Sequence, residues 1–176
     1  MSDVLQVVES VIHEQEPPLS TGLYTVRTVP SLQIVGRNIV EEDSNNPKVI
    51  NGQPLGVPIN DNTTFLFRRV GGDTFFISCG RDGGRVVEME GKVVAVFSDV
   101  PEDPFEYFVN PRWIIQRQPQ HGDDIYTIES ENGYWGWVMP TENPQYTPVR
   151  VRQLAATATM PPRYPPNQLW VIERVG

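Results

Sequence analysis

The sequence predicts an all-β protein with one main domain. Short runs rich in valine, isoleucine and aromatic residues alternate with turn residues, which is the pattern of strands and hairpins. The 17 prolines and 14 glycines among 176 residues favour many turns over long helices. The same short residue patterns also return three times along the chain, which predicts a structure built from three similar units.

The first repeated pattern is a triplet of an aromatic residue, any residue and a β-branched residue. It opens each predicted repeat, and its copies lie 51 residues apart. The copies are Tyr24-Thr25-Val26, Phe75-Phe76-Ile77 and Tyr126-Thr127-Ile128. These triplets favour strands because aromatic and β-branched side chains fit a pleated, half-buried surface.

The second repeated pattern closes each repeat with an aromatic residue, an apolar pair, a polar residue and an arginine, at residues 65–69, 113–117 and 170–174. Its aromatic residues are predicted to be equivalent core positions near a threefold pseudo-axis; they are Phe65, Trp113 and Trp170. Between the two patterns each repeat has room for two more strands. We place these near residues 32–40 and 47–51, 84–90 and 92–97, and 134–139 and 147–154, which gives about twelve strands.

Together these features predict a β-trefoil over residues 20–176, a closed barrel of hairpins capped by further hairpins. Closure of the barrel removes exposed sheet edges, which suits a chain with little helix and no disulfide. Residues 1–19 are predicted to be an N-terminal extension. Within it, residues 4–12 carry apolar side chains at helix-face spacing, so a short helix is expected, although their β-branched content leaves a strand open.

Composition excludes several classes of partner. The formal net charge of −8 repels polyanions, so nucleic acid is not expected to bind. No apolar run approaches the ~20 residues that span a bilayer, so no membrane partner is expected. The start of the chain lacks the basic residues of a signal peptide. We therefore expect a cytoplasmic monomer that needs no cofactor.

Residues capable of catalysis are scarce, which predicts that the protein is not an enzyme. The chain has two histidines, His13 and His121, and the latter lies in an HGDD sequence that is typical of a turn. The lone thiol, Cys79, is interpreted as a small core residue. The acidic run at residues 41–43 is interpreted as a solvated loop, so no metal site is expected.

A proline-rich stretch near the end of the chain is the first candidate binding site. The sequence AATATMPPRYPPN, residues 155–167, is predicted to form an exposed loop between two strands. Proline fixes φ and pushes the preceding residue towards extended geometry, so the loop is shaped before it binds. The candidate binding residues are Met160, Pro161, Pro162, Arg163, Tyr164 and Pro165.

Framework residues carry a resemblance to a known family. The segments GLYTVR, DIYTIE, PRWIIQR, NQLWVIERV and WVMPTENPQYTPVRV resemble the mushroom β-trefoil protease inhibitors. The resemblance covers residues 20–175 and points to cospin-like serine-protease inhibitors and, more distantly, to mycocypins. It implies a fungal inhibitor of a serine protease that uses different loops of one rigid scaffold. The second candidate loop, with Asn45, Asn46 and Lys48, lies in a region that members of the family use.

Arg163 is the predicted specificity residue of the proline-rich loop if the chain is such an inhibitor. The pocket of a trypsin-like protease ends in a carboxylate, and a guanidinium pairs with it through charge-assisted hydrogen bonds. We expect the Arg163–Tyr164 peptide to be presented to the protease in a substrate-like manner. Two alternatives stay open: a rigid connector with one solvated arginine, and a PPxY peptide over residues 161–164 that a WW module would bind.

A carbohydrate-binding protein of the same fold is the alternative function. Trefoil lectins often repeat a Gln-x-Trp signature, and this chain contains it once, as Gln168-Leu169-Trp170. The aromatic run at residues 134–137 contains two tryptophans, and strand alternation is expected to bury at least one of them. The sequence therefore favours inhibition of a trypsin-like protease through Arg163 over sugar binding.

Overall fold

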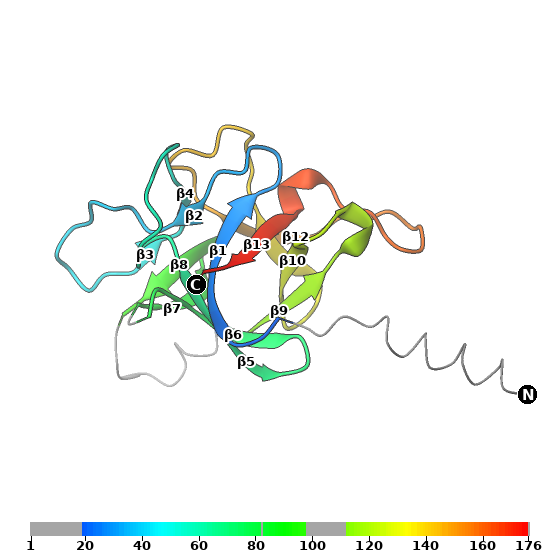
Figure 1. Cartoon of the computed structure of the whole chain (residues 1–176), viewed down its shortest axis with the longest axis horizontal. Coiled ribbons are helices and arrows are strands. Elements are labelled where there is room, and N and C mark those ends of the chain that lie inside the picture. The colour runs from blue at the N-terminus through cyan, green and yellow to red at the C-terminus, as the bar shows by residue number, and fades with distance from the viewer. Residues whose placement is uncertain (1–18, 82, 98–111, 176) are drawn as a thin grey trace, which may run out of the picture.

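A computed structural model describes residues 19–81, 83–97 and 112–175, which form thirteen β-strands and two short 3-10 helices (Figure 1). The strands are β1 (Gly22–Thr28), β2 (Val35–Gly36), β3 (Lys48–Val49), β4 (Asn51–Gly52), β5 (Phe65–Gly71), β6 (Thr74–Cys79), β7 (Arg85–Met89), β8 (Lys92–Val96), β9 (Arg112–Arg117), β10 (Ile125–Ser130), β11 (Trp135–Val138), β12 (Arg150–Gln153) and β13 (Trp170–Arg174). The 3-10 helices are η2 (Pro119–His121) and η3 (Pro166–Gln168). The helix expected in the N-terminal extension lies outside the described residues.

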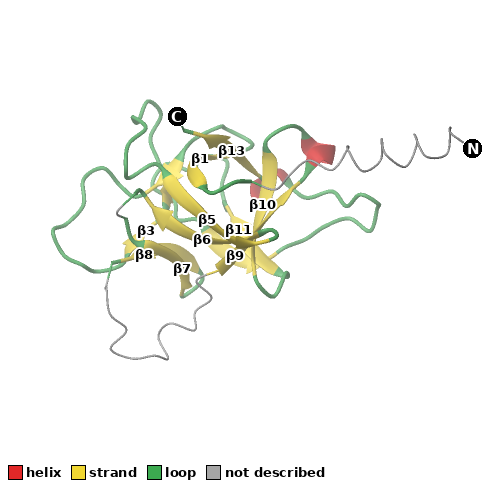
Figure 2. Ribbon diagram, turned by 60° about the horizontal axis from the view of Figure 1, so that its bottom comes forward, coloured by secondary structure: helices red, strands yellow, loops and turns green. Residues whose placement is uncertain are grey.

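Six strands close into an antiparallel ring, and they are the strands that contain the two repeated sequence patterns. Following the ring, β1 pairs with β5, β5 with β6, β6 with β9, β9 with β10, β10 with β13, and β13 with β1. Each closing strand thus pairs with the opening strand of its own repeat and with that of the next. The strands gather at the centre of the molecule and the loops project from it (Figure 2).

The remaining strands form hairpin-like pairs beside the ring. These pairs are β2–β4, β7–β8 and β11–β12, and β8 also pairs with β3 and β12. The strands predicted at residues 84–90, 92–97, 134–139 and 147–154 are present as β7, β8, β11 and β12. The prediction of an all-β protein is confirmed, and the ring with its three pairs supports the predicted three-repeat architecture.

The first repeat differs from its prediction. The strand expected over residues 32–40 is reduced to β2, because the Arg37 N–H donates to the Asn62 carbonyl oxygen (2.7 Å) instead of to a strand partner. The strand expected over residues 47–51 is divided into β3 and β4. The division occurs because the chain changes partner at Ile50, from β8 on one side to β2 on the other.

Four aromatic side chains fill the centre of the core. The predicted equivalents Phe65, Trp113 and Trp170 are 0%, 1% and 0% exposed. The Trp137 ring lies among them, with centroid distances of 6.1, 5.7 and 6.0 Å and interplanar angles of 65°, 85° and 87°. This edge-to-face geometry is a preferred arrangement for aromatic rings. The Trp137 indole therefore contacts all three repeats. Trp135, on the same strand, is 45% exposed and does not belong to this aromatic cluster.

Replacing Trp137 with alanine is expected to lower the free energy of unfolding by about 3–5 kcal/mol, the usual cost of removing a large buried aromatic side chain. No described residue pairs with the Trp137 indole N–H, so the loss comes from packing alone. Urea unfolding measures it, with Trp135→Ala as the control on the same strand, expected to cost less than about 1 kcal/mol. Equal losses in the two variants would contradict the central role of Trp137.

Candidate functional site

The proline-rich loop lies within residues 154–169, which connect β12 to β13, and it projects from the barrel (orange in Figure 1). Met160 is 93% exposed, and the Met160–Pro161 peptide bond is cis. The base of the loop is closed by Gln168, which is 6% exposed and whose side-chain oxygen accepts the Ala155 N–H (3.2 Å). The loop is therefore attached at both ends to a buried part of the fold.

The backbone of Arg163 is bonded to Thr157 across the loop. Its N–H donates to Thr157 Oγ1 and its carbonyl oxygen accepts the Thr157 N–H, both at 2.9 Å. The backbone N–H and the backbone carbonyl oxygen of Arg163 thus face the same side of the loop. This differs from the expected substrate-like presentation, because the Arg163 carbonyl is engaged within the loop.

The backbone groups of the two neighbouring residues face the opposite side and are bonded to η2. The Pro162 carbonyl oxygen accepts a hydrogen bond from Gln120 Nε2 (2.7 Å), and the Tyr164 N–H donates to His121 Nε2 (3.0 Å). Alternation of partners along residues 162–164 is the pattern of a chain that is paired on both edges. Segments 42 and 43 residues apart in the sequence therefore hold the loop beside Arg163.

The side chain of Arg163 is exposed and available. Within the described part of the chain, its guanidinium has no hydrogen-bonding or ion-pairing partner. Arg163 is also the one charged residue in the sequence of the proline-rich loop. The loop therefore carries one exposed cation, and four backbone polar groups of residues 162–164 are hydrogen-bonded around it.

A buried chain of hydrogen bonds continues from η2 into the barrel. Gln120 Nε2 donates to Gln118 Oε1 (2.8 Å), and Gln118 Nε2 donates to Thr127 Oγ1 (3.0 Å). The Thr127 hydroxyl donates to Glu129 Oε2 (2.9 Å), and this glutamate is 8% exposed. Burial raises the pKa of the Glu129 carboxyl, and the Thr127 hydrogen bond offsets part of that rise. The loop is thereby connected to β10.

His121 has a role that the sequence does not indicate, since an HGDD segment is typical of a turn. A backbone N–H can only donate, so the Nε2 atom that accepts from Tyr164 carries a lone pair and the imidazole is neutral. Burial, and then the nearby Arg163 cation, lower the pKa of His121. The contact joins residues far apart in sequence, and no local motif marks it.

The second candidate loop, between β2 and β3, is held by internal contacts. The Lys48 ammonium donates to the Glu42 carbonyl oxygen (3.1 Å) and to Glu42 Oε1 (3.3 Å), and the Lys48 side chain is 10% exposed. Lys48 therefore fixes the loop, while Asn45 and Asn46 are exposed. This loop (cyan in Figure 1) and the proline-rich loop lie on opposite sides of the barrel, so they do not reach one protease cleft together.

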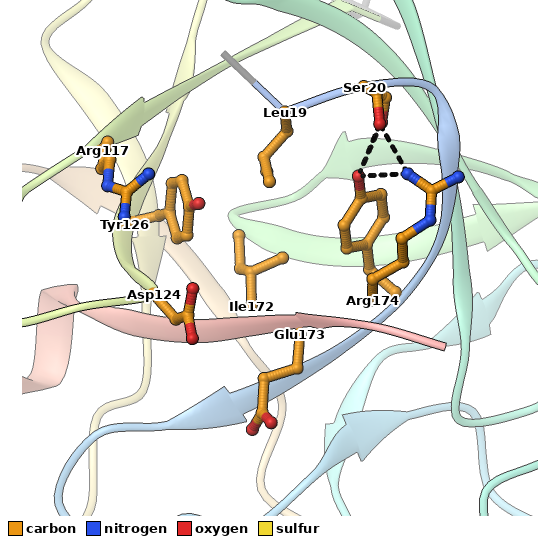
Figure 3. Close-up of a pocket in the computed structure, with 9 residues that line it drawn as sticks. Leu19, Ser20, Arg117, Asp124, Tyr126, Ile172, Glu173 and Arg174 are labelled. Atoms are coloured by element: carbon orange, nitrogen blue, oxygen red, sulfur yellow. Dashed lines mark hydrogen bonds between the residues drawn. The ribbon is translucent and has the colours of Figure 1, made fainter. Parts of the chain in front are cut away.

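A recess of about 410 Å³ opens at one end of the barrel, where the described chain begins (Figure 3). The Arg174 guanidinium donates to Ser20 Oγ (2.5 Å) and to the Tyr24 hydroxyl (3.4 Å). The walls carry charges of both signs, from Arg117, Arg174, Asp124 and Glu173. This mixture favours no single charged ligand, so the recess is a weaker candidate than the proline-rich loop.

Other chemistry is poorly supported in the described ranges. They contain no group of three histidine, cysteine, aspartate or glutamate residues that would hold a metal ion. In the acidic run, Glu41 pairs with Arg37 and Glu42 with Lys48. Burial raises the pKa of the Cys79 thiol to about 12, which leaves it protonated and unreactive at neutral pH. No helix in the described segments is long and apolar enough to cross a membrane.

Comparison with known families and structures identifies the family of the chain. The family model described as Peptidase inhibitor I66 matches residues 17–174. A proteinase inhibitor from Coprinopsis cinerea is similar in structure, with a TM-score of 0.75 and 29% sequence identity over 89% of this chain and 99% of that one. Among curated proteins, no sequence matches this chain.

Two fungal lectins share the fold at lower identity. A ricin B-like lectin from Macrolepiota procera, in complex with lactose, has a TM-score of 0.61 and 16% identity, over 91% of this chain and all (100%) of that one. The Rhizoctonia solani agglutinin has a TM-score of 0.63 and 18% identity, over 92% of this chain and 100% of its own. At such identities the similarity concerns the fold alone.

Replacing Glu129 with glutamine is expected to stabilise the fold more at pH 8 than at pH 4. A carboxyl whose pKa rises on folding favours the folded state only when protonated, so the parent loses stability as the pH rises from the ordinary value of 4.5 through the raised one. The amide stays neutral, and its oxygen still accepts from Thr127. Urea unfolding at the two pH values measures the difference, with the exposed Glu173→Gln as control; a pH-independent effect would contradict the burial of a charge at Glu129.

Proposed function

The chain belongs to the peptidase inhibitor I66 family, and we propose that it inhibits a trypsin-like serine protease by inserting Arg163 into the specificity pocket. Membership of this family makes it an inhibitor rather than an enzyme. One observation carries the choice of residue: a single exposed guanidinium stands on a backbone that is hydrogen-bonded on both edges.

Charge favours arginine as the inserted residue. The specificity pocket of a trypsin-like protease ends in a carboxylate, and the planar guanidinium can pair with it through two parallel hydrogen bonds. Arg163 enters such a pocket without first breaking an internal ion pair with any described residue. In the second loop, by contrast, the Lys48 ammonium would have to leave Glu42.

Preorganisation reduces the cost of binding. Four prolines, at positions 161, 162, 165 and 166, restrict the unfolded chain, and each is worth roughly 0.4–1 kcal/mol where its geometry suits the fold. The bonds to Thr157, Gln120 and His121 hold the folded loop in place. Little conformational freedom is then left to lose when the protease binds, so more of the contact energy appears as affinity.

The same contacts explain how the loop would resist hydrolysis. Cleavage requires the Arg163 carbonyl to reach the oxyanion donors of the protease. In the free protein that carbonyl accepts the Thr157 N–H, so hydrolysis requires the Arg163 edge to separate from Thr157. We therefore propose that insertion begins with the side chain and that the peptide bond is presented only slowly.

The scaffold for this activity is proposed to be a β-trefoil that acts as a monomer. The six-stranded ring and its three hairpin-like pairs support the trefoil.

Sugar binding is less well supported. The tryptophan of the Gln-Leu-Trp sequence, Trp170, is 0% exposed and donates its indole N–H to the Trp137 carbonyl oxygen (3.1 Å), so it packs in the core and offers no face to a sugar.

Arg163→Glu is expected to weaken inhibition of trypsin at least about 100-fold, because a carboxylate would face the carboxylate of the pocket. Arg163→Lys should keep part of the affinity. Inhibition constants against trypsin, chymotrypsin, subtilisin and papain test both variants. The control is Arg152→Glu, an equal change of charge at an exposed residue of β12, and it should inhibit like the parent. Unchanged inhibition by Arg163→Glu would remove this loop from the proposed function.

Thr157→Val is expected to make the loop a better substrate. Valine has nearly the same shape but lacks the Oγ1 atom that accepts the Arg163 N–H, so the Arg163 edge separates more easily. Mass spectrometry after long incubation with trypsin should show faster cleavage of the Arg163–Tyr164 bond than in the parent. Cleavage at the parental rate would show that Thr157 does not protect this bond.

A further inference from the structure

The residues on either side of Arg163 are held by two adjacent side chains of η2. Gln120 binds the Pro162 carbonyl oxygen and His121 binds the Tyr164 N–H. The link between η2 and the loop is thus made by an amide that stays neutral and by an imidazole whose charge depends on pH.

We propose that Gln120 and His121 are positioning residues for Arg163, and that binding to the protease weakens when His121 becomes protonated. This inference rests on the proposed function of the loop. It concerns how the loop is held rather than which residue enters the pocket, so it can fail while the proposed function stands.

Gln120 fixes the position of the loop relative to the barrel. Its Nε2 group has two protons, and it donates to Pro162 O and to Gln118 Oε1. Gln118 is 6% exposed and is itself held by Thr127, which is 0% exposed. The buried Gln118 side chain therefore fixes the direction of the Gln120 amide. The Gln120 amide in turn fixes the position of Pro162, the residue that precedes Arg163.

His121 holds the other side through a bond that only the neutral ring can make. The imidazolium form has N–H groups at both ring nitrogens and no acceptor. Protonation would set an N–H of the ring against the N–H of Tyr164, so the 3.0 Å contact could not persist. Loss of this contact releases Tyr164, the residue that follows Arg163. Binding to the protease would then have to order the loop again, which costs free energy.

Burial and the Arg163 cation favour the neutral His121 ring at pH 7. Burial lowers the pKa of His121 from the ordinary value of 6.5, and Arg163, on the loop, lowers it further because it repels the imidazolium. The centroid of the Tyr164 ring lies 6.3 Å from that of the imidazole. Burial, and then the Glu129 carboxylate on β10, raise the pKa of the Tyr164 hydroxyl. Asp123 and Asp124 follow in the same turn, and Asp124 lines the recess at the barrel end (Figure 3). The contact is therefore complete above pH 6.5 and is lost as the pH falls below the lowered pKa.

The first experiment measures the dissociation constant for trypsin whose active-site serine is replaced by alanine, from pH 8 to pH 5. The variant His121→Gln places an amide oxygen, which does not titrate, near the position of Nε2. Its affinity at pH 8 should be close to that of the parent. Towards pH 5 the parent should weaken about tenfold more than this variant, the worth of one hydrogen bond. Dividing the two curves cancels titration of the protease.

The second experiment removes the side chains. His121→Ala and Gln120→Ala should each weaken binding about tenfold at pH 8 and accelerate cleavage of the Arg163–Tyr164 bond by active trypsin. Gln153→Ala, at an exposed glutamine of β12, is the control and should behave like the parent. Thermal unfolding shows whether each variant keeps the parental fold, which separates a positioning role from a purely structural one.

The outcomes separate the two proposals. If Arg163→Glu abolishes binding while both alanine variants bind like the parent and the pH ratio stays flat, the positioning role is overturned and the proposed function remains. If Arg163→Glu binds normally, both are overturned. Hydrogen exchange gives a test without protease: protection of the Tyr164 amide should fall as His121 titrates in the free protein, and constant protection would overturn the pH-dependent contact.

Discussion

The packing of one indole against three aromatic rings is the contact on which the rest of the structure depends. Trp137 lies within 6.1 Å, centroid to centroid, of the core aromatic residue that each repeat contributes. The three closing strands are thereby held around one point, and the ring of six strands can close with its polar backbone groups paired. A closed ring has no edge that is free to shift, so the loops that leave it start from fixed positions.

A series of hydrogen bonds connects the proline-rich loop to the barrel around this core. Glu129 and Thr127 lie on β10, a strand of the ring, and Gln118 and Gln120 extend their hydrogen bonds to the loop. Thr157 completes the arrangement from the opposite edge. The result is a loop whose backbone is fixed, while the Arg163 guanidinium is exposed and has no partner among the described residues. This division suits an inhibitor, since specificity comes from the side chain and durability from the backbone.

The sequence was sufficient for the parts of the fold that repeat. The triplets at 51-residue intervals and the closing patterns located the six strands of the ring, because each copy reinforces the others. The first repeat was predicted less well, since the change of partner at Ile50 has no local signal. In the site, proline and arginine marked the loop, whereas the contacts of Thr157, Gln120 and His121 depend on how distant segments meet. Such contacts arise only in the tertiary structure, and no spacing of residues in the sequence indicates them.

The central claim is that the Arg163 side chain enters the protease while the loop keeps its own contacts. The most direct measurement is a crystal structure of the complex with trypsin. The account predicts the guanidinium within hydrogen-bonding distance of the pocket carboxylate, with Gln120 and His121 still bonded to Pro162 and Tyr164. A complex in which Asn45 and Asn46 occupy the cleft and Arg163 remains in solvent would contradict it.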